Sequence, residues 1–397
     1  MNSSPQTHRL QLIQYGLAIF LFWVSMYLYV PTLPVYAQSK TNNLALTGII
    51  LSMYGLWQGL ARFPLGVYSD RLGKRKLFVF IGFGLSAAGA WLMGTAPNST
   101  VLLIGRSVTG LAAATWVPLV VAFTHLFPKG ETLRASAVVN LLNSLGMVVG
   151  TLLTGWLNGL GGTSLAFYLA IGVAGVAGMV MLPFAEKSML PQKRSMGEIK
   201  NLVARRSVLA PSLLGALAQY AVWATVFSFI PILAKQYGAS DVLQSMLLSL
   251  NIAIVLVGNL AVTAFVKRFG ARPLLYFSFV LMSLGMVFAA LANSLVLVFV
   301  AQFCNGFALG IGFPILMGLS VENASEQERS TAMGLFQAVY AIGMFTGPWL
   351  SGFMANNMGI QPMFAVTAGA VLLVALFGMG FLAPSRKTSE VPRVLDD

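Results

Sequence analysis

The segment Gly66-Val67-Tyr68-Ser69-Asp70-Arg71-Leu72-Gly73-Lys74-Arg75-Lys76 concentrates five charges where two long apolar runs meet. It stands out because 57% of the 397 residues are hydrophobic and only 9% are charged. An ordinary soluble domain carries about 25% charged residues, which it needs to cover its surface. The composition therefore indicates a polytopic membrane protein, whose outer surface faces lipid. It excludes a soluble enzyme, a nucleic-acid-binding domain and a disordered protein.

Twelve runs of the sequence are long and apolar enough to cross a bilayer as helices. They predict an all-α fold with transmembrane helices at 12–36, 44–69, 77–95, 101–126, 133–158, 164–183, 208–234, 241–266, 273–292, 295–320, 329–356 and 361–382. The first run is expected to be a retained membrane helix, because its apolar core from Leu12 to Val30 is longer than that of a signal peptide.

Basic residues gather on one side of these predicted helices. With the N-terminus placed inside, 20 of the 24 lysines and arginines fall in inner segments, whereas Lys40 and Lys235 fall in outer loops. The remaining two, Arg62 and Arg106, lie within helices. Since short cytoplasmic loops are enriched in Lys and Arg, both termini are expected to face the cytoplasm. The net charge of +13 therefore reflects membrane orientation, and no nucleic-acid partner is expected.

Internal repetition predicts two pseudo-symmetric six-helix bundles. The glycines of Gly146-Met147-Val148-Val149-Gly150 return in Gly343-Met344-Phe345-Thr346-Gly347, 197 positions later. The same spacing relates Gly155 to Gly352 and Gly73 to Gly270. The long basic stretch near the middle of the chain reads as a tether between the two copies. We expect an N-terminal bundle at 1–184, a cytoplasmic linker at 185–207, and a C-terminal bundle with a short tail at 208–397.

The charged segment resembles the G-x-x-x-D-R-x-G-R/K-R/K loop of the major facilitator superfamily, and it stands after the second helix, as in that family. Arg106-Ser107-Val108-Thr109-Gly110 is similar to a second family motif, R-x-x-x-G. The resemblance covers the whole chain. It implies a secondary transporter with a central cavity between two bundles, opened alternately to each side. The loop is similar to that of the drug and metabolite exporter branch, although Met147 replaces the proline of a G-P-x-x-G motif in the antiporters.

The chemistry of this loop suggests a conformational switch. Gly66 is expected to let the second helix approach a neighbouring backbone closely. Asp70 is expected to dock at the N-terminus of the helix that begins near Arg329, where unpaired N–H groups and the helix dipole favour an anion. The candidate switch residues are Gly66, Asp70, Arg71, Gly73 and Arg75. Alternatively, the loop serves only as a positive-inside anchor.

Polar and aromatic residues at helical spacing give several helices one face that could line a cavity. The candidate substrate or coupling residues are Trp23, Tyr27, Tyr54, Gln58, Arg62, Arg106, Asn140, Asn143, Gln219, Trp223, Asn251, Asn305, Gln337 and Tyr340. Each residue, taken alone, is equally compatible with packing between helices.

Arg62 and Arg106 are the two charged residues placed well inside the membrane, and no carboxylate is expected at mid-depth. A buried arginine must find carbonyls, amides, water or an anion. We therefore expect a cavity that attracts anionic or zwitterionic solutes. The alternative is that Arg106 is structural and Arg62 reaches the inner water layer.

These features favour a transporter of the bacterial-type inner membrane that exports drugs or metabolites in exchange for protons. An organic-anion or phosphate-compound carrier and a non-transporting receptor or scaffold are the alternatives. No enzymatic activity is expected, because no catalytic pairing of side chains occurs. Cys304 is the single cysteine, so neither a disulfide within the chain nor a cysteine-based metal site is expected, and no cofactor is expected. The expected partners are a small solute and the lipid bilayer, with the protein acting as a monomer.

Overall fold

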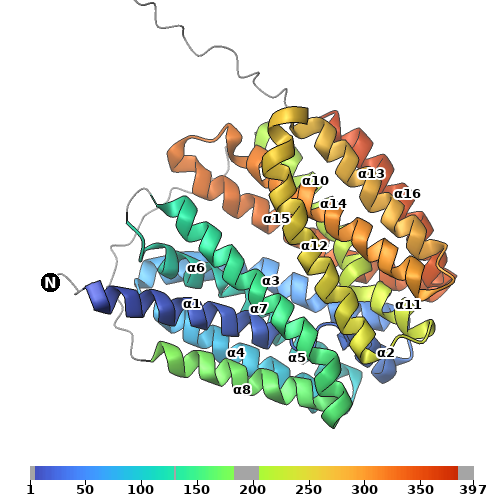
Figure 1. Ribbon diagram of the computed structural model, residues 1–397, viewed down its shortest axis with the longest axis horizontal. Helices are drawn as coiled ribbons and strands as arrows, with labels where there is room; N and C mark the ends of the chain where they lie inside the picture. Colours follow the sequence, from blue (N-terminus) through green and yellow to red (C-terminus); the bar gives the residue numbers. More distant parts are fainter. Residues whose placement is uncertain (1–4, 129–130, 183–204, 383–397) are drawn as a thin grey trace, which may run out of the picture.

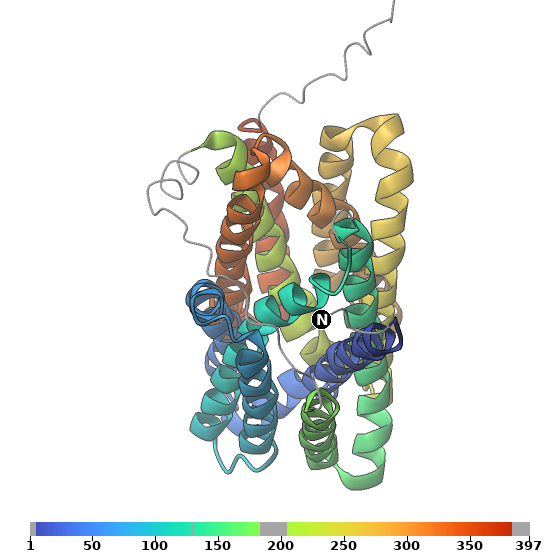
Figure 2. The same ribbon diagram turned by 90° about the vertical axis from the view of Figure 1, so that its left-hand side faces the viewer.

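The computed structural model describes residues 5–128, 131–182 and 205–382, and all regular structure in these ranges is helical. The first half of the chain supplies α1 (Pro5–Tyr27), α2 (Leu33–Thr41), α3 (Leu44–Leu72), α4 (Arg75–Gly94), α5 (Ser99–Ala114), α6 (Trp116–Thr124), α7 (Thr132–Gly161) and α8 (Thr163–Met181). Figures 1 and 2 show these helices as one group, which lies beside the helices of the second half.

The second half supplies α10 (Arg206–Ala224), the π-helix η1 (Thr225–Phe229), α11 (Ile230–Gln236), α12 (Asp241–Phe269), α13 (Ala271–Ala290), α14 (Leu295–Glu322), α15 (Glu326–Met358) and α16 (Ile360–Met379). Most of the predicted linker 185–207 lies outside the described residues, so the predicted domain boundaries stay predictions. The described helices themselves form the two groups that the internal repeat predicts.

Three of the predicted membrane helices are broken. The run 12–36 divides into α1 and α2 around Pro31, the run 101–126 divides at Thr115, and the run 208–234 passes through η1 before Pro231. A proline lacks the N–H that an unbroken helix needs. The Thr115 hydroxyl donates to the carbonyl of Ala112 at 2.7 Å, which satisfies an acceptor where α5 ends.

Eleven helical stretches of the described chain are long and apolar enough to cross a membrane. α15 supplies the twelfth crossing with its 33 residues, and its first turn carries charged residues such as Glu328 and Arg329. α15 packs between α3 and α10, so its surroundings are largely protein, and it can be less apolar than a lipid-facing helix. The structure thus has the predicted all-α fold with twelve transmembrane helices in two bundles.

Small residues bring equivalent helices together in each bundle. A side chain at Gly146 or Gly150 of α7 would overlap the backbone of α1, and a side chain at Gly343 or Gly347 of α15 would overlap the backbone of α10. The repeated glycines therefore mark the same contact in both halves. Glycines at these positions let two helix backbones approach closely.

The two halves contact each other closely at one end of the bundle, which we call the closed end and define by Thr32, Asn158, Lys235 and Asp241. Figure 1 shows the two groups of helices inclined to each other, with the contacting helices α2 and α11 near this end. Deeper in the molecule, the Thr151 hydroxyl of α7 lies 2.7 Å from the Ser249 hydroxyl of α12. These contacts join α7 to α12 over the last turns of one helix and the first turns of the other.

Candidate functional site

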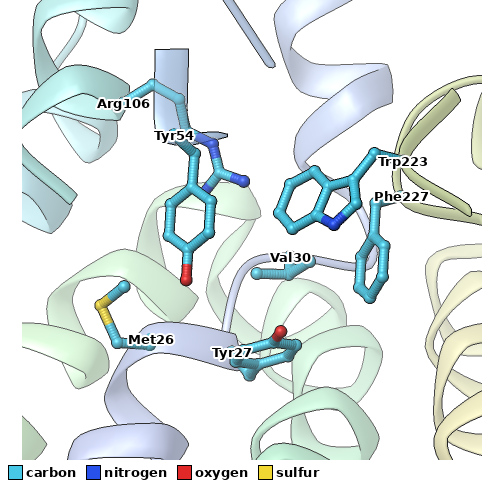
Figure 3. Close-up of a pocket in the computed structure, with 7 residues that line it drawn as sticks. All are labelled: Met26, Tyr27, Val30, Tyr54, Arg106, Trp223 and Phe227. Carbon is cyan, nitrogen blue, oxygen red and sulfur yellow. The ribbon is translucent and has the colours of Figure 1, made fainter. Parts of the chain in front are cut away.

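A small cavity lies between the two halves, adjacent to the closed end. It is lined by Met26, Tyr27, Val30, Tyr54, Arg106, Trp223 and Phe227, and its free volume is about 10 Å³. α1 and the turn after it, α3, α5, α10 and η1 each contribute to this lining. Figure 3 shows Arg106 and Tyr54 facing Trp223 and Phe227 across the space, with Met26 and Tyr27 on another side. Ligand pockets commonly measure about 300–1,000 Å³, so a drug-sized ligand requires the halves to part.

The walls of the cavity are aromatic and meet across the boundary between the halves. The ring of Tyr54 lies nearly parallel to that of Trp223, with centroids 5.2 Å apart and planes inclined by 17°. Trp223 lies similarly against Phe227, with centroids 4.8 Å apart. Tyr27 meets Phe227 edge-on at 6.5 Å. Both halves therefore contribute rings to one apolar surface.

Arg106 is the one charged residue of the lining. Its side chain is 3% exposed, and its guanidinium carbon lies over the Tyr54 ring, 4.4 Å from the centroid. The Nε atom of Arg106 has no hydrogen-bond partner among the described residues. A cation over a ring face is stabilised by the ring quadrupole, which supplies part of what the guanidinium lost on leaving water.

A nine-residue repeat supplies five of the seven lining residues, and sequence reasoning missed it. Residues 23–31 read W-V-S-M-Y-L-Y-V-P, and residues 223–231 read W-A-T-V-F-S-F-I-P, 200 positions later. The pattern W-x-x-x-Y/F-x-Y/F-V/I-P would have paired Tyr27 with Phe227, which was not among the candidates. Met26 and Val30 were also missed, since an apolar side chain in a membrane helix carries no distinguishing signal.

Gln58 and Arg62 lie one and two turns along α3 from Tyr54, away from the closed end. Arg62 is 8% exposed and donates from Nη1 to the Tyr340 hydroxyl of α15 at 2.5 Å. This bond joins the two halves, and the guanidinium carbon also lies 5.8 Å from the Tyr340 ring centroid. The Gln58 Oε1 atom is buried without a hydrogen-bond partner among the described residues. Arg62 therefore has a hydroxyl acceptor in the other half, whereas the sequence analysis named carbonyls, amides, water, an anion or the inner water layer.

The remaining candidates are not brought to the cavity lining. Trp23 is buried against Trp116, with ring centroids 5.1 Å apart. Asn140 is exposed, and Asn143, Gln219 and Gln337 are partly buried.

Two amides lie inside the second half. Asn251 donates to the carbonyl of Gln302 at 2.9 Å, and Asn305 donates to the carbonyl of Ala301 at 2.9 Å. Asn251 and Gln302 stand 197 and 196 positions after Tyr54 and Arg106. Where the first half places a guanidinium over a ring, the second half thus has a neutral pair. The charge at the cavity comes from one half alone.

The structure describes part of the candidate switch. Gly73 ends α3 with φ of +61°, a left-handed conformation that glycine adopts without strain. Arg71 is exposed. Among the described residues, a side chain added at Gly66 would meet Val117 of the same half at an ordinary 3.8 Å, so the expected close approach to another backbone stays a prediction. The backbone of Asp70 belongs to the last turn of α3, but its side chain lies outside the described part of the structure. The docking of Asp70 therefore stays a prediction.

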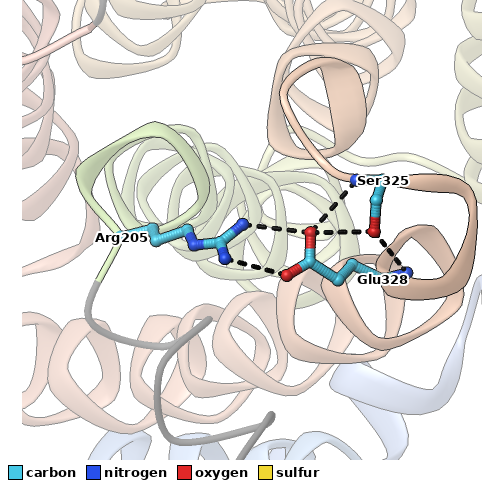
Figure 4. A network of polar contacts seen from close by, with 3 residues as sticks. All are labelled: Arg205, Ser325 and Glu328. Carbon is cyan, nitrogen blue, oxygen red and sulfur yellow. Dashed lines mark hydrogen bonds and ion pairs between the residues drawn. The ribbon is translucent and has the colours of Figure 1, made fainter.

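The start of α15, the predicted partner of Asp70, is capped by residues of its own half (Figure 4). The Ser325 side chain accepts from the Glu328 backbone N–H, and Glu328 accepts from the Ser325 backbone N–H at 3.1 Å, forming a capping box. Arg205 pairs with both carboxylate oxygens of Glu328, at 3.0 and 2.9 Å. The hydrogen bond from the Ser325 backbone N–H lowers the pKa of Glu328 below its usual range, and the hydrogen bond from Arg205 lowers it further.

Two bundles of membrane-crossing helices, with a cavity at their boundary and close contact at one end, define a membrane carrier. The chain belongs to the Major Facilitator Superfamily, whose family model matches residues 15–213 and 212–397. It is an integral membrane protein and a transporter of small molecules, not an enzyme.

Similar proteins agree with this assignment. The multidrug resistance protein MdtG of Citrobacter koseri is 25% identical over 94% of this chain and 95% of its own length. MdtG of Escherichia coli is 24% identical over 97% of both chains. Two solved structures share the fold: a POT family transporter in complex with 5-aminolevulinic acid (TM-score 0.80, 11% identity, covering 94% and 96% of the two chains), and an inward-facing bacterial homolog of the human lysosomal transporter Spinster (0.77, 16%, 96% and 98%). The chain therefore resembles the drug-exporter branch of the family.

Proposed function

We propose that this protein is a proton-coupled exporter of drugs or metabolites that works by alternating access as a monomer in a bacterial inner membrane. The observation that carries the proposal is a cavity lined by both halves and lying directly inside a closed end. A site shared by two bodies is exposed to one side or the other as those bodies rock about it.

The orientation of the closed end rests on the distribution of basic residues. The positive-inside rule places both termini in the cytoplasm and the loops at Lys40 and Lys235 outside. Since Lys235 belongs to the closed end, that end faces outward, and the structure corresponds to a state sealed against the outside. This state is the one in which an exporter takes up substrate from within the cell.

Export is favoured over uptake by the relatives named multidrug resistance proteins. The organic-anion or phosphate carrier is the second candidate, and the observation that favours it is the buried guanidinium of Arg106 without an acidic residue beside it in the cavity. A receptor or scaffold on the same fold would bind without moving a solute, so measured flux distinguishes it from both carriers.

A reversible cross-link between α7 and α12, just inside the closed end, tests alternating access. The double variant Thr151→Cys/Ser249→Cys, in a Cys304→Ala background, places two thiols where hydroxyls lie 2.7 Å apart. We expect oxidation to stop transport in proteoliposomes and reduction to restore it. The two single-cysteine variants are the controls and should be insensitive to oxidant. Undiminished transport by the cross-linked protein would exclude movement at this end.

Proton coupling is tested in the same proteoliposomes. A pH gradient, acidic on the side into which substrate is exported, should accelerate export of dyes and antibiotics, and substrate addition should release protons to the opposite side. Equal rates with and without the gradient, at an unchanged membrane potential, would leave a facilitative carrier as the correct description.

A further inference from the structure

The cavity combines aromatic surface from both halves with one positive charge. Four of its seven lining residues are aromatic, namely Tyr27, Tyr54, Trp223 and Phe227. Arg106 is the one charged member, and no aspartate or glutamate belongs to the lining. An apolar ligand body is thus accommodated beside a single cationic group.

Arg106 has unused hydrogen-bonding capacity at this position. Its side chain is 3% exposed, and its Nε atom has no hydrogen-bond partner in the described part of the chain. Buried polar atoms without a partner are uncommon and call for a specific reason. Because a guanidinium matches the planar geometry of a carboxylate, an acid group on a ligand supplies an anionic acceptor, which the cavity lining does not contain.

Aromatic walls by themselves would favour cationic ligands, since ring faces attract cations. In this cavity the Tyr54 ring already binds a cation of the protein itself, the Arg106 guanidinium. The Arg106 guanidinium lies 4.4 Å from the centroid of the Tyr54 ring, so a second cation on this ring would meet a like charge in a medium of low dielectric. The site therefore discriminates against cations while keeping its affinity for flat apolar groups.

We propose that the cavity selects aromatic acids, with the ring packed against Tyr54 and Trp223 and the acid group bound to Arg106. This inference rests on the proposed function, because it names the substrate class of the same site. The ring centroids of Tyr54 and Trp223 lie 5.2 Å apart across the two halves, and the free volume beside them is about 10 Å³. When the halves part, a ligand ring takes over the contacts that these two rings now make with each other.

Four probes of similar size separate ring from charge on the unmodified protein. They are 2-naphthoate, decahydro-2-naphthoate, 2-naphthamide and the 2-naphthyltrimethylammonium cation, and their dissociation constants are measured by titration calorimetry on the full chain in nanodiscs. We expect 2-naphthoate to bind on the order of tenfold more tightly than the amide, as a charge-assisted hydrogen bond predicts. It should bind about threefold to tenfold more tightly than the saturated acid, as ring packing predicts. The cation should bind most weakly.

Two variants assign these preferences to residues. Arg106→Gln should weaken both acids by on the order of tenfold and leave 2-naphthamide unchanged. Trp223→Leu should weaken the two ring-bearing neutral and anionic probes and leave decahydro-2-naphthoate unchanged. Arg272→Gln and Trp91→Leu are matched controls, because Arg272 donates to the Leu382 carbonyl and Trp91 is 55% exposed on α4, both away from the lining.

The proposal fails if the cationic or the neutral probe binds the unmodified protein as tightly as 2-naphthoate. That comparison needs no variant, so it decides the question even if Arg106→Gln does not fold. The proposal also fails if a folded Arg106→Gln protein keeps the full preference for acids. Either result leaves the reversible cross-link at Thr151 and Ser249 as an independent test of transport, so failure of the substrate class and failure of the carrier function are distinguishable.

Discussion

The Asn158 amide nitrogen of α7 donates to the Asp241 carboxylate of α12 at 2.8 Å, and this bond joins the two halves at the closed end. The same nitrogen donates to the Thr32 hydroxyl at 3.1 Å, which links the bond to the turn between α1 and α2. On the other side, Asp241 pairs with Lys235 of α11 at 3.6 Å. The Asp241 carboxylate thus joins α12 to α7 and α11, and Asn158 extends the network to the turn before α2.

Removal of this bond should favour opening of the closed end. A hydrogen bond to a charged group contributes about 1.5–3 kcal/mol, so Asn158→Ala should shift the population by roughly tenfold or more toward the state open at this end. Spin labels at Ser39 and Val242, in a Cys304→Ala background, would report the change as a longer distance. Asn357→Ala is the control, since Asn357 donates within α15 to the Phe353 carbonyl and should leave the distance distribution unaltered. An unchanged distribution in Asn158→Ala would show that this bond does not hold the end closed.

Gly155 should be indispensable for closure. A Cβ atom there would overlap the backbone of Asp241 and Val242. Relieving this overlap requires one packed helix to move away from the other, because a helix backbone cannot shift locally as a flexible side chain can. We expect Gly155→Val to hold the halves apart and to reduce the transport rate by on the order of tenfold or more, as a population shift of a few kcal/mol implies. Gly159→Val, one turn further along α7, meets nothing within 4 Å and serves as the control. Equal rates in the two variants would count against closure at this contact.

The capped start of α15 should make stability depend on pH. The native contacts depress the pKa of Glu328, so their contribution is present above the pKa of the unfolded chain, about 4.3, and is lost as the pH falls through the native pKa. Glu328→Gln should therefore lower the unfolding temperature slightly at pH 7, and the difference should vanish in acid. Thermal unfolding across pH measures this, with the exposed Glu322→Gln as control. A pH-independent difference would assign the effect to shape, not charge.

The predicted switch at Asp70 is tested by removing its charge. The loss of an anion at a helix N-terminus costs about 0.3–1 kcal/mol, or up to about 2 if partly buried. Asp70→Asn should thus slow transport without abolishing substrate binding. Lys267, which occupies the equivalent place in the second half, supplies the control variant Lys267→Gln. If Asp70→Asn transports at the unmodified rate at equal expression, the charged loop after α3 serves only as a positive-inside anchor.

Topology is tested by reporter fusions. Fusions at Lys40 and Lys235 should report an external location, and a fusion at Lys74 should report the cytoplasm, because 20 of the 24 basic residues lie on one predicted side. A cytoplasmic signal from Lys40 or Lys235 would reverse the orientation and, with it, the direction assigned to the closed end.

The sequence by itself determined the membrane-spanning fold. Whether a segment crosses lipid depends on a sum over about 20 neighbouring residues, and such a sum can be made along the chain. The repeated glycines could also be read from the sequence, because a missing side chain is a property of the residue itself. Gly146 and Gly343 must meet another backbone wherever that backbone comes from, and the structure shows that α1 and α10 provide it. The sequence did not predict the helix breaks near Pro31, Thr115 and Pro231, because proline is tolerated in many membrane helices.

Only the tertiary structure decided which residues meet at the cavity. Tyr54, Arg106 and Trp223 come from three helices, and their proximity depends on how each helix is rotated and tilted. Asn251 and Asn305 carry the same polar signal in sequence, yet they hydrogen-bond to carbonyls within the second half. Hydropathy records that a polar residue sits in a membrane helix, but not toward which neighbour it points. That direction is set by packing between helices distant in sequence, and no sum along a single helix contains it.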